Sequence, residues 1–147
     1  MAPLWIDIAK KEIGNKEITG GKDNPRILEY HSTTLLKAKH DEVPWCSAFV
    51  NWVISQTGLK GTGSASARSW LKWGKGIAEP AVGAITVIWR TSPKSWEGHV
   101  GFYLGPDPND KSRILVLGGN QKDRVSIASY ETSRVLGYRW PSVNEAV

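Results

Sequence analysis

The spacing of apolar residues changes about halfway along this chain of 147 residues. Up to about residue 76, apolar residues recur every three or four positions, as on one face of an α-helix. Between about residues 81 and 141, short β-rich runs are separated by Gly, Pro, Asp and Asn. These runs are AITVIW, HVGFYLG, RILVLGG, RVSIASY and VLGYRW. Helices followed by about five strands predict an α+β fold, with the helices packed on an antiparallel sheet.

Four helices are expected in the first half, each with a recognisable start or stop. The first contains Leu4 and stops at Gly14, and the second has Pro25 in its first turn, where proline is tolerated. The third is the segment around residues 44–58, and the fourth is the short stretch ARSWLKWG. No repeat or linker separates the two halves, so residues 1–147 are predicted to form one domain.

The third helix carries the only cysteine of the chain, in the stretch DEVPWCSAFVNWV. Pro44 is expected in its first turn, and Asp41 and Glu42 suit the positive end of its dipole. Cys46 would then lie at a helix N-terminus, where the pKa of a thiol is lowered. A lone cysteine is more often a small buried apolar residue, so this position alone does not assign it a role.

The composition excludes several classes of function. A net charge of +5 favours an anionic partner, but the basic residues are scattered and no nucleic-acid-binding motif is present, so nucleic acid is not expected as a partner. No apolar run approaches the roughly 20 residues of a transmembrane helix, so stable membrane insertion is not expected. The N-terminal stretch lacks the features of a signal peptide, which predicts a protein made in the cytoplasm.

Two further residues have the properties that a thiol nucleophile requires. His99 opens one predicted strand, and Asn120 ends the next. An imidazole can take the thiol proton, and a carboxamide can fix the tautomer of the imidazole. The start of one strand and the end of its antiparallel neighbour meet at one end of a sheet, so His99 and Asn120 can lie together. Taken singly, each also has a structural interpretation, as a hydrogen-bonded histidine and a turn residue.

The stretches PWCSAFVNWV, GHVGFYLG and VLGGNQ resemble the CHAP branch of the papain-like cysteine amidohydrolases and peptidases, which cut bacterial peptidoglycan. The chain is most similar to the compact single-domain type of phages and bacteria. The resemblance implies a papain-like fold, with Cys46 as nucleophile, His99 as general base and Asn120 as the residue that orients His99. Many CHAP enzymes carry a glutamate two positions before that asparagine, where this chain has Gly118. Whether Asn120 or another residue orients the histidine is therefore open.

Three more residues are candidates for contact with the substrate. Trp45 and Trp96 lie near the nucleophile and the base in sequence, and Gln121 follows the asparagine. Core packing is the alternative for both tryptophans, because their large apolar area drives burial. The resemblance further implies peptidoglycan as the partner, with no metal and no cofactor, and a monomer is expected. The bond that is cut, amidase or endopeptidase type, is not defined by the sequence.

Other functions remain open at this point. A zinc-dependent amidase would draw ligands from Cys46, His31, His40 and His99, although no pair has the spacing of common zinc motifs. A non-catalytic wall-binding module would use the basic, tryptophan-rich surface. An acyltransferase would form the same thioester but pass its acyl group to an acceptor other than water. A phage endolysin, which acts on the wall after release from the host cytoplasm, is the expected role. A secreted antibacterial amidase effector is the alternative.

Overall fold

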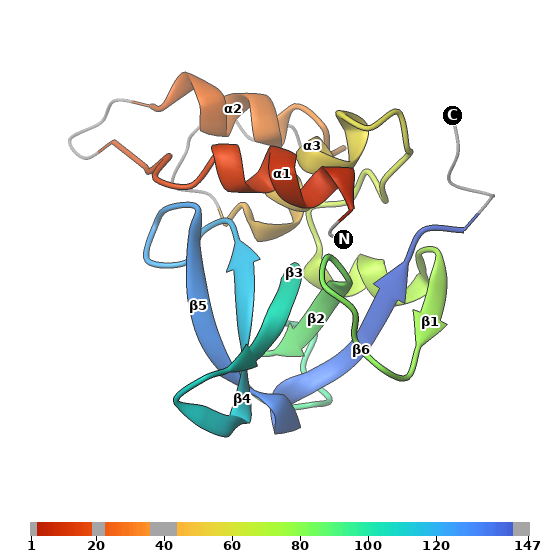
Figure 1. The fold of residues 1–147 in the computed structure, drawn as a ribbon. Helices are drawn as coiled ribbons and strands as arrows, with labels where there is room; N and C mark the ends of the chain where they lie inside the picture. The colour runs from red at the N-terminus through yellow and green to blue at the C-terminus, as the bar shows by residue number, and fades with distance from the viewer. Residues whose placement is uncertain (1–2, 19–22, 36–43, 143–147) are drawn as a thin grey trace.

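The computed structural model describes residues 3–18, 23–35 and 44–142, in which a layer of helices lies against a curved sheet (Figure 1). The helices are α1 (Leu4–Lys11), α2 (Pro25–His31) and α3 (Cys46–Ser55), with the 3-10 helices η1 (Ala67–Lys72) and η2 (Thr132–Arg134). The strands are β1 (Lys75–Ile77), β2 (Ile85–Trp89), β3 (Gly98–Asp107), β4 (Asp110–Gly118), β5 (Ser126–Glu131) and β6 (Val135–Trp140).

The helices begin and end close to the predicted positions, with one correction. Asn24 caps α2 by accepting a hydrogen bond from the N–H of Arg26, and Pro25 is its first residue. Pro44 lies outside α3, not in its first turn, because the helix begins at Cys46 with Trp45 as the N-cap. The acidic pair predicted to precede this helix, residues 41 and 42, lies outside the described residues. No helix in the described part of the chain is long and apolar enough to cross a membrane.

The sheet has six antiparallel strands in the order β1-β6-β2-β3-β4-β5. Five of them are the predicted β-rich runs. The sixth, β1, was not predicted, because its three residues are too few to show an alternating pattern. It follows Gly74, whose φ of 58° turns the chain, and pairs with β6 at the edge of the sheet.

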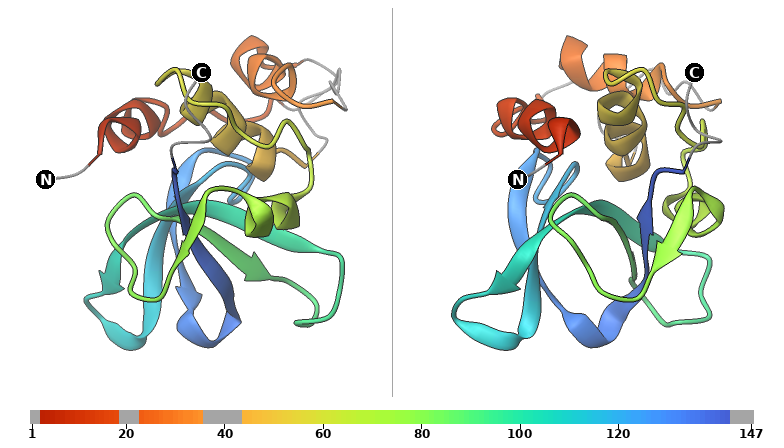
Figure 2. Two further views of the ribbon diagram at one scale, coloured as in Figure 1. Left: turned by 90° about the vertical axis from the view of Figure 1, so that its right-hand side faces the viewer. Right: turned by 45° about the vertical axis from the view of Figure 1, so that its right-hand side comes forward.

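Both faces of β2 are buried, which gives this strand a nearly continuous apolar sequence. Ile85 and Val87 face a core shared with all three α-helices and η1, whereas Ala84 and Ile88 face a second cluster. The second cluster also contains Tyr103, Ile114 and Val116. Figure 2 shows that the sheet is strongly curved. The helix α3 is buried along most of its length and packs with β3 and β4, which places its N-terminus over one end of the sheet.

Candidate active site

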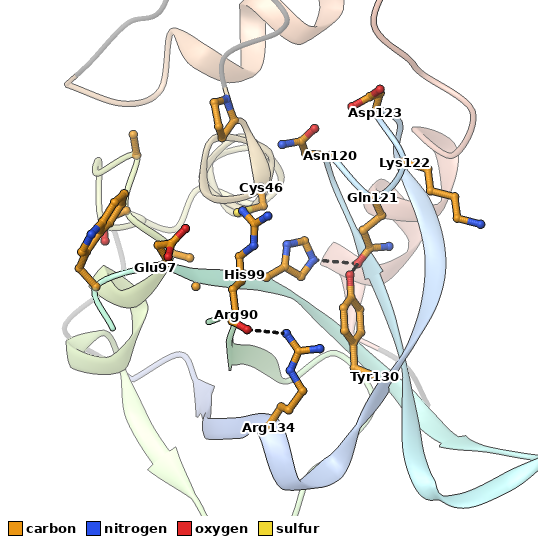
Figure 3. A pocket seen from close by; sticks show the side chains of 16 residues that line it. Cys46, Arg90, Glu97, His99, Asn120, Gln121, Lys122, Asp123, Tyr130 and Arg134 are labelled. Atoms are coloured by element: carbon orange, nitrogen blue, oxygen red, sulfur yellow. Dashed lines mark hydrogen bonds between the residues drawn. The ribbon is translucent and has the colours of Figure 1, made fainter. Parts of the chain in front are cut away.

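A cleft of about 590 Å³ opens where the N-terminus of α3 meets the end of the sheet (Figure 3). Cys46 is the first residue of α3, His99 is the second residue of β3, and Asn120 lies in the loop after β4. All three line this cleft. The structure therefore brings together the three residues that the sequence selected as a catalytic group.

Cys46 lies beside backbone N–H groups at the helix N-terminus and on the sheet. The N–H groups of Val100 and Ser47 favour the charged form of its thiol, and Val100 is the neighbour of His99 on β3. Burial raises the pKa of the Cys46 thiol, and these N–H groups, with the charge of Arg90, oppose the rise. Because burial is the largest of these effects, the resting thiol is protonated at neutral pH.

Polar side chains on the other side of α3 fix the helix against the loop at residues 61–66. Ser47 Oγ donates to the carbonyl of Ser64 at 2.6 Å and accepts from the indole of Trp70 at 3.0 Å. Asn51 accepts from the N–H of Gly63 at 2.9 Å and donates to the carbonyl of Ser64 at 3.3 Å. These bonds join the helix that carries the nucleophile to a loop that forms one wall of the cleft.

The ring of His99 is hydrogen-bonded to Gln121, with Nε2 and Oε1 2.8 Å apart. The amide nitrogen of Gln121 donates to the carbonyls of Ser126 at 2.7 Å and Val116 at 3.3 Å, so its oxygen faces the ring. Nε2 of His99 must then carry the proton, and Nδ1 keeps a lone pair. This is the tautomer in which Nδ1 can accept the proton of a thiol.

Tyr130 completes this group of side chains. Its hydroxyl donates to Gln121 Oε1 at 3.0 Å, and its ring lies 5.3 Å from that of His99. Burial and the negative charge of an ionised Cys46 raise the pKa of Tyr130 to about 12, so it remains a donor. Burial lowers the pKa of His99 to about 4, with Arg90 and Arg134 acting in the same direction and the Gln121 bond opposing them. At neutral pH the imidazole is therefore uncharged.

A model of the CHAP domain family matches residues 38–120, which is more than half of the chain. The chain belongs to the CHAP domain family. This is a family of peptidoglycan hydrolases with cysteine peptidase or amidase chemistry.

A solved structure supports the fold. The crystal structure of a protein described as similar to a lipoprotein, of the NLP/P60 family, from Staphylococcus aureus subsp. aureus Mu50 matches with a TM-score of 0.54. The two chains are 17% identical, and the match covers 95% of this chain and 41% of the other, so this chain spans about two-fifths of its relative's length. The predicted α+β, papain-like fold is confirmed. No curated protein matches the sequence significantly.

The hydrogen bond predicted for Asn120 of this CHAP domain is made by Gln121 instead. Asn120 has a left-handed backbone, with φ of 59°, and among the described residues it makes no hydrogen bond to His99. Lys122 and Asp123 in the same loop are also left-handed, with φ of 57° and 63°. This backbone path turns the carboxamide of Gln121 inward, toward the ring of His99, and leaves that of Asn120 beside the N-terminus of α3 (Figure 3).

Gly118 explains why a glutamine can take this place. A Cβ atom at residue 118 would lie 2.8 Å from Gln121 Oε1 and 3.2 Å from His99 Nε2. A side chain at 118, where many CHAP enzymes carry glutamate, would therefore approach the same ring nitrogen. The carboxamide of Gln121 fills the space that the glycine leaves. Glycine at 118 together with glutamine at 121 is the feature of the sequence that could have indicated that Gln121 takes the place of the usual glutamate.

The three predicted substrate-binding residues have different surroundings. Trp45 is fully buried, donates to the carboxylate of Glu17 at 3.0 Å and stacks on Tyr30, so it is a core residue and its predicted contact with substrate is wrong. Gln121 is only 5% exposed, and its carboxamide is used by the bonds described above. Trp96 lines the cleft and is 84% exposed, as a residue that contacts a ligand at a rim would be.

Arg68 on η1 holds the loop that carries Trp96, a role that no feature of the sequence indicated. Its guanidinium donates to the carbonyls of Glu97 at 2.8 Å and of Pro93 and Ser92 at 3.1 Å each. Three bonds to one loop give the exposed tryptophan a fixed base. Arg68 therefore shapes the rim of the cleft without facing it.

The zinc hypothesis required a cluster of ligands that included His31 and His40. His31 is a buried residue of α2, and His40 lies outside the described residues. Within residues 3–18, 23–35 and 44–142, no three His, Cys, Asp or Glu side chains are grouped as metal ligands.

Proposed function

We propose that this CHAP domain cleaves an amide or peptide bond of bacterial peptidoglycan by a thiol mechanism. Cys46 is the nucleophile, His99 is the general base and acid, and Gln121 orients His99. The observation that carries the proposal is the 2.8 Å bond between His99 Nε2 and Gln121 Oε1. It presents the unprotonated ring nitrogen in the same cleft as a cysteine at a helix N-terminus.

The first half of the reaction forms a thioester. His99 Nδ1 takes the proton of Cys46 as the sulfur attacks the carbonyl carbon of the scissile amide. The resulting oxyanion is stabilised by N–H groups at the start of α3, which have no partner within the helix. When the carbon–nitrogen bond breaks, the protonated His99 gives its proton to the departing amine. The acyl group remains on the sulfur of Cys46.

The second half returns the enzyme to its resting state. His99 takes a proton from a water molecule, whose oxygen attacks the thioester carbonyl. The carbon–sulfur bond then breaks, the sulfur regains a proton from His99, and the acid product leaves. The bond from Gln121 keeps Nδ1 directed at the reacting atoms in both halves.

The surroundings of the site suit a polymeric, anionic wall. A net charge of +5 attracts an anionic polymer, and the exposed indole of Trp96 offers an apolar surface at the rim. We infer that a monomer acts on the wall, as a phage endolysin released from the host cytoplasm or as a secreted antibacterial effector.

Digestion of purified peptidoglycan from a Gram-negative species tests the mechanism. Wild-type protein, with and without a chelator, is compared with Cys46→Ala, and the products are identified by mass spectrometry. We expect defined fragments from wild type, no effect of the chelator, and no products from a folded Cys46→Ala variant. The masses then distinguish amidase from endopeptidase cleavage.

Three other results would contradict this proposal. Equal digestion by Cys46→Ala would make Cys46 a packing residue. Loss of activity with the chelator would indicate a metal-dependent amidase. Sedimentation of both proteins with the wall, without any products, would indicate a binding module.

A further inference from the structure

Arg90 lies directly beside the reacting groups. In the pairing of β2 with β3, Ile88 is opposite His99 and Trp89 is opposite Gly98. Residues opposite one another share a face of the sheet, and Arg90 follows Ile88 by two positions, so it continues the face of His99. Figure 3 shows its side chain extending toward Cys46, and both residues line the cleft.

The guanidinium of Arg90 has no counter-charge in the described part of the chain. Arg90 is exposed, and its guanidinium makes no hydrogen bond there. The ion pairs among those residues join Arg26 to Glu12 and to Glu29, far along the sequence from this site. The positive charge of Arg90 therefore lies near Cys46 and is available to a ligand.

The guanidinium of the neighbouring Arg134, unlike that of Arg90, is hydrogen-bonded within the protein. It donates to the carbonyl of Trp89 at 2.8 and 3.1 Å and to that of Arg90 at 3.4 Å, and it lies over the ring of Trp89. Arg134 thus braces the end of β2, from which Arg90 projects. The guanidinium of Arg134 is used to hold the strand end, whereas that of Arg90 extends into the cleft without such bonds.

The nearby acidic group on the rim does not pair with Arg90. The carboxylate of Glu97 accepts from the hydroxyls of Thr91 at 2.6 Å and Ser95 at 3.4 Å, within its own loop. A guanidinium presents a planar fork of donors that matches a carboxylate, and in a partly enclosed cleft such a bond is stronger than in water. Arg90 therefore has no bonded carboxylate among the described residues, and an anionic group of the ligand can reach it.

We propose that Arg90 binds a free carboxylate on a residue that flanks the scissile amide. This rests on the proposed function and narrows its substrate class. The cleft would prefer wall-stem segments with free carboxylates beside the scissile amide to the same segments in amidated form. The carboxylate would also anchor the substrate at a fixed distance from the sulfur of Cys46.

Two peptides and four proteins test this assignment. One stem peptide carries free carboxylates beside the scissile amide, and the other carries carboxamides at the same positions. The proteins are wild type, Arg90→Gln, Arg90→Lys and the control Lys111→Gln, which removes an exposed positive charge from the β3–β4 hairpin at the other end of the sheet. Thermal unfolding checks that each variant is folded, and kcat and KM are measured for every pair.

We expect amidation to lower kcat/KM about 10- to 100-fold for wild type and Lys111→Gln, the range for a charge-assisted hydrogen bond. Arg90→Gln should lose a similar factor on the free peptide and be nearly indifferent to amidation. Arg90→Lys, which keeps the charge without the fork, should lie between them. Such non-additivity identifies a direct contact between Arg90 and the carboxylate.

Two patterns would overturn the assignment. An equal loss on both peptides in Arg90→Gln would mean that Arg90 acts on the thiol or on the fold. An equal effect of amidation in wild type and Arg90→Gln would place the carboxylate elsewhere.

A binding measurement separates this proposal from the proposed cleavage. Calorimetric titration of both peptides into Cys46→Ala, with and without Arg90→Gln, requires no turnover. A preference for the free peptide that disappears with Arg90→Gln supports the carboxylate site even if wild type cuts neither peptide. Absence of any preference overturns it, whatever bond wild type cleaves.

Discussion

His99 Nε2 and Gln121 Oε1 lie 2.8 Å apart, and this one bond determines which ring nitrogen faces the cysteine. The oxygen of Gln121 also accepts from Tyr130, while its nitrogen donates to two carbonyls of β4 and β5. A carboxamide with both ends bonded cannot flip without breaking several hydrogen bonds. The tautomer of His99 is thus set by a rigid group, not by the half-buried Asn120.

Replacing Gln121 should impair catalysis more than replacing Asn120. Gln121→Ala removes the acceptor of Nε2–H and is expected to lower kcat about 100- to 1000-fold, by analogy with the loss of the orienting residue in other triads. Tyr130→Phe removes only the bond that supports Gln121, for which we expect a loss of about 3- to 10-fold. Asn120→Ala serves as the control. A larger loss for Asn120→Ala than for Gln121→Ala would contradict this assignment.

A glutamate at residue 118 should replace the lost carboxamide. The Cβ of such a residue would lie 3.2 Å from His99 Nε2, so Gly118→Glu in a Gln121→Ala background can direct a carboxylate at the ring. We expect this double variant to recover at least about 10-fold of the activity lost in Gln121→Ala, measured as kcat on one peptide. Gly118→Ala alone should reduce activity, because its Cβ would displace Gln121. A double variant with the same kcat as Gln121→Ala would show that a carboxylate at residue 118 cannot replace the carboxamide of Gln121.

Local signals placed Cys46 at a helix start and His99 at a strand start, and the resemblance to CHAP enzymes supplied their predicted roles. The sequence could not decide between Asn120 and Gln121. Both are carboxamides, and the choice depends on which residues of the loop take a positive φ. Likewise, the sequence does not show which of Trp45 and Trp96 is buried. Only packing between distant segments buries one and exposes the other.

The two tryptophans should therefore respond to alanine in opposite ways. Trp45→Ala removes a fully buried ring that packs on Tyr30 and Gly119, and should lower the free energy of unfolding by about 3–5 kcal/mol. Trp96→Ala should leave that free energy within about 0.5 kcal/mol and raise KM for polymeric wall several-fold. Urea unfolding and wall-digestion kinetics on both variants test this. An unchanged KM for Trp96→Ala would remove Trp96 from the binding surface.

The pH profile of activity should have a broad plateau. Catalysis needs one proton shared between the thiol and the imidazole, so kcat/KM should rise as pH increases through the His99 pKa of about 4. It should fall only above the raised pKa of Cys46. Initial rates from pH 3.5 to 10 test this expectation. An acidic limb near the ordinary histidine value of 6.5 would show that burial does not dominate at His99.

The same burial links the stability of the fold to pH. The pKa of His99 is about 4 in the folded protein and about 6.5 in the unfolded chain, so between these values the unfolded state binds more protons. The free energy of unfolding should therefore fall as pH decreases from 6.5 to 4, by no more than about 3 kcal/mol from this residue. Urea unfolding at pH 7.0 and 4.5 measures the difference. His99→Gln removes the titrating group, so the free energy of unfolding of this variant should change less between the two pH values than that of wild type. The change that the variant still shows belongs to the other acidic and histidine residues. An identical change in both proteins would show that His99 stays accessible to solvent protons in the fold.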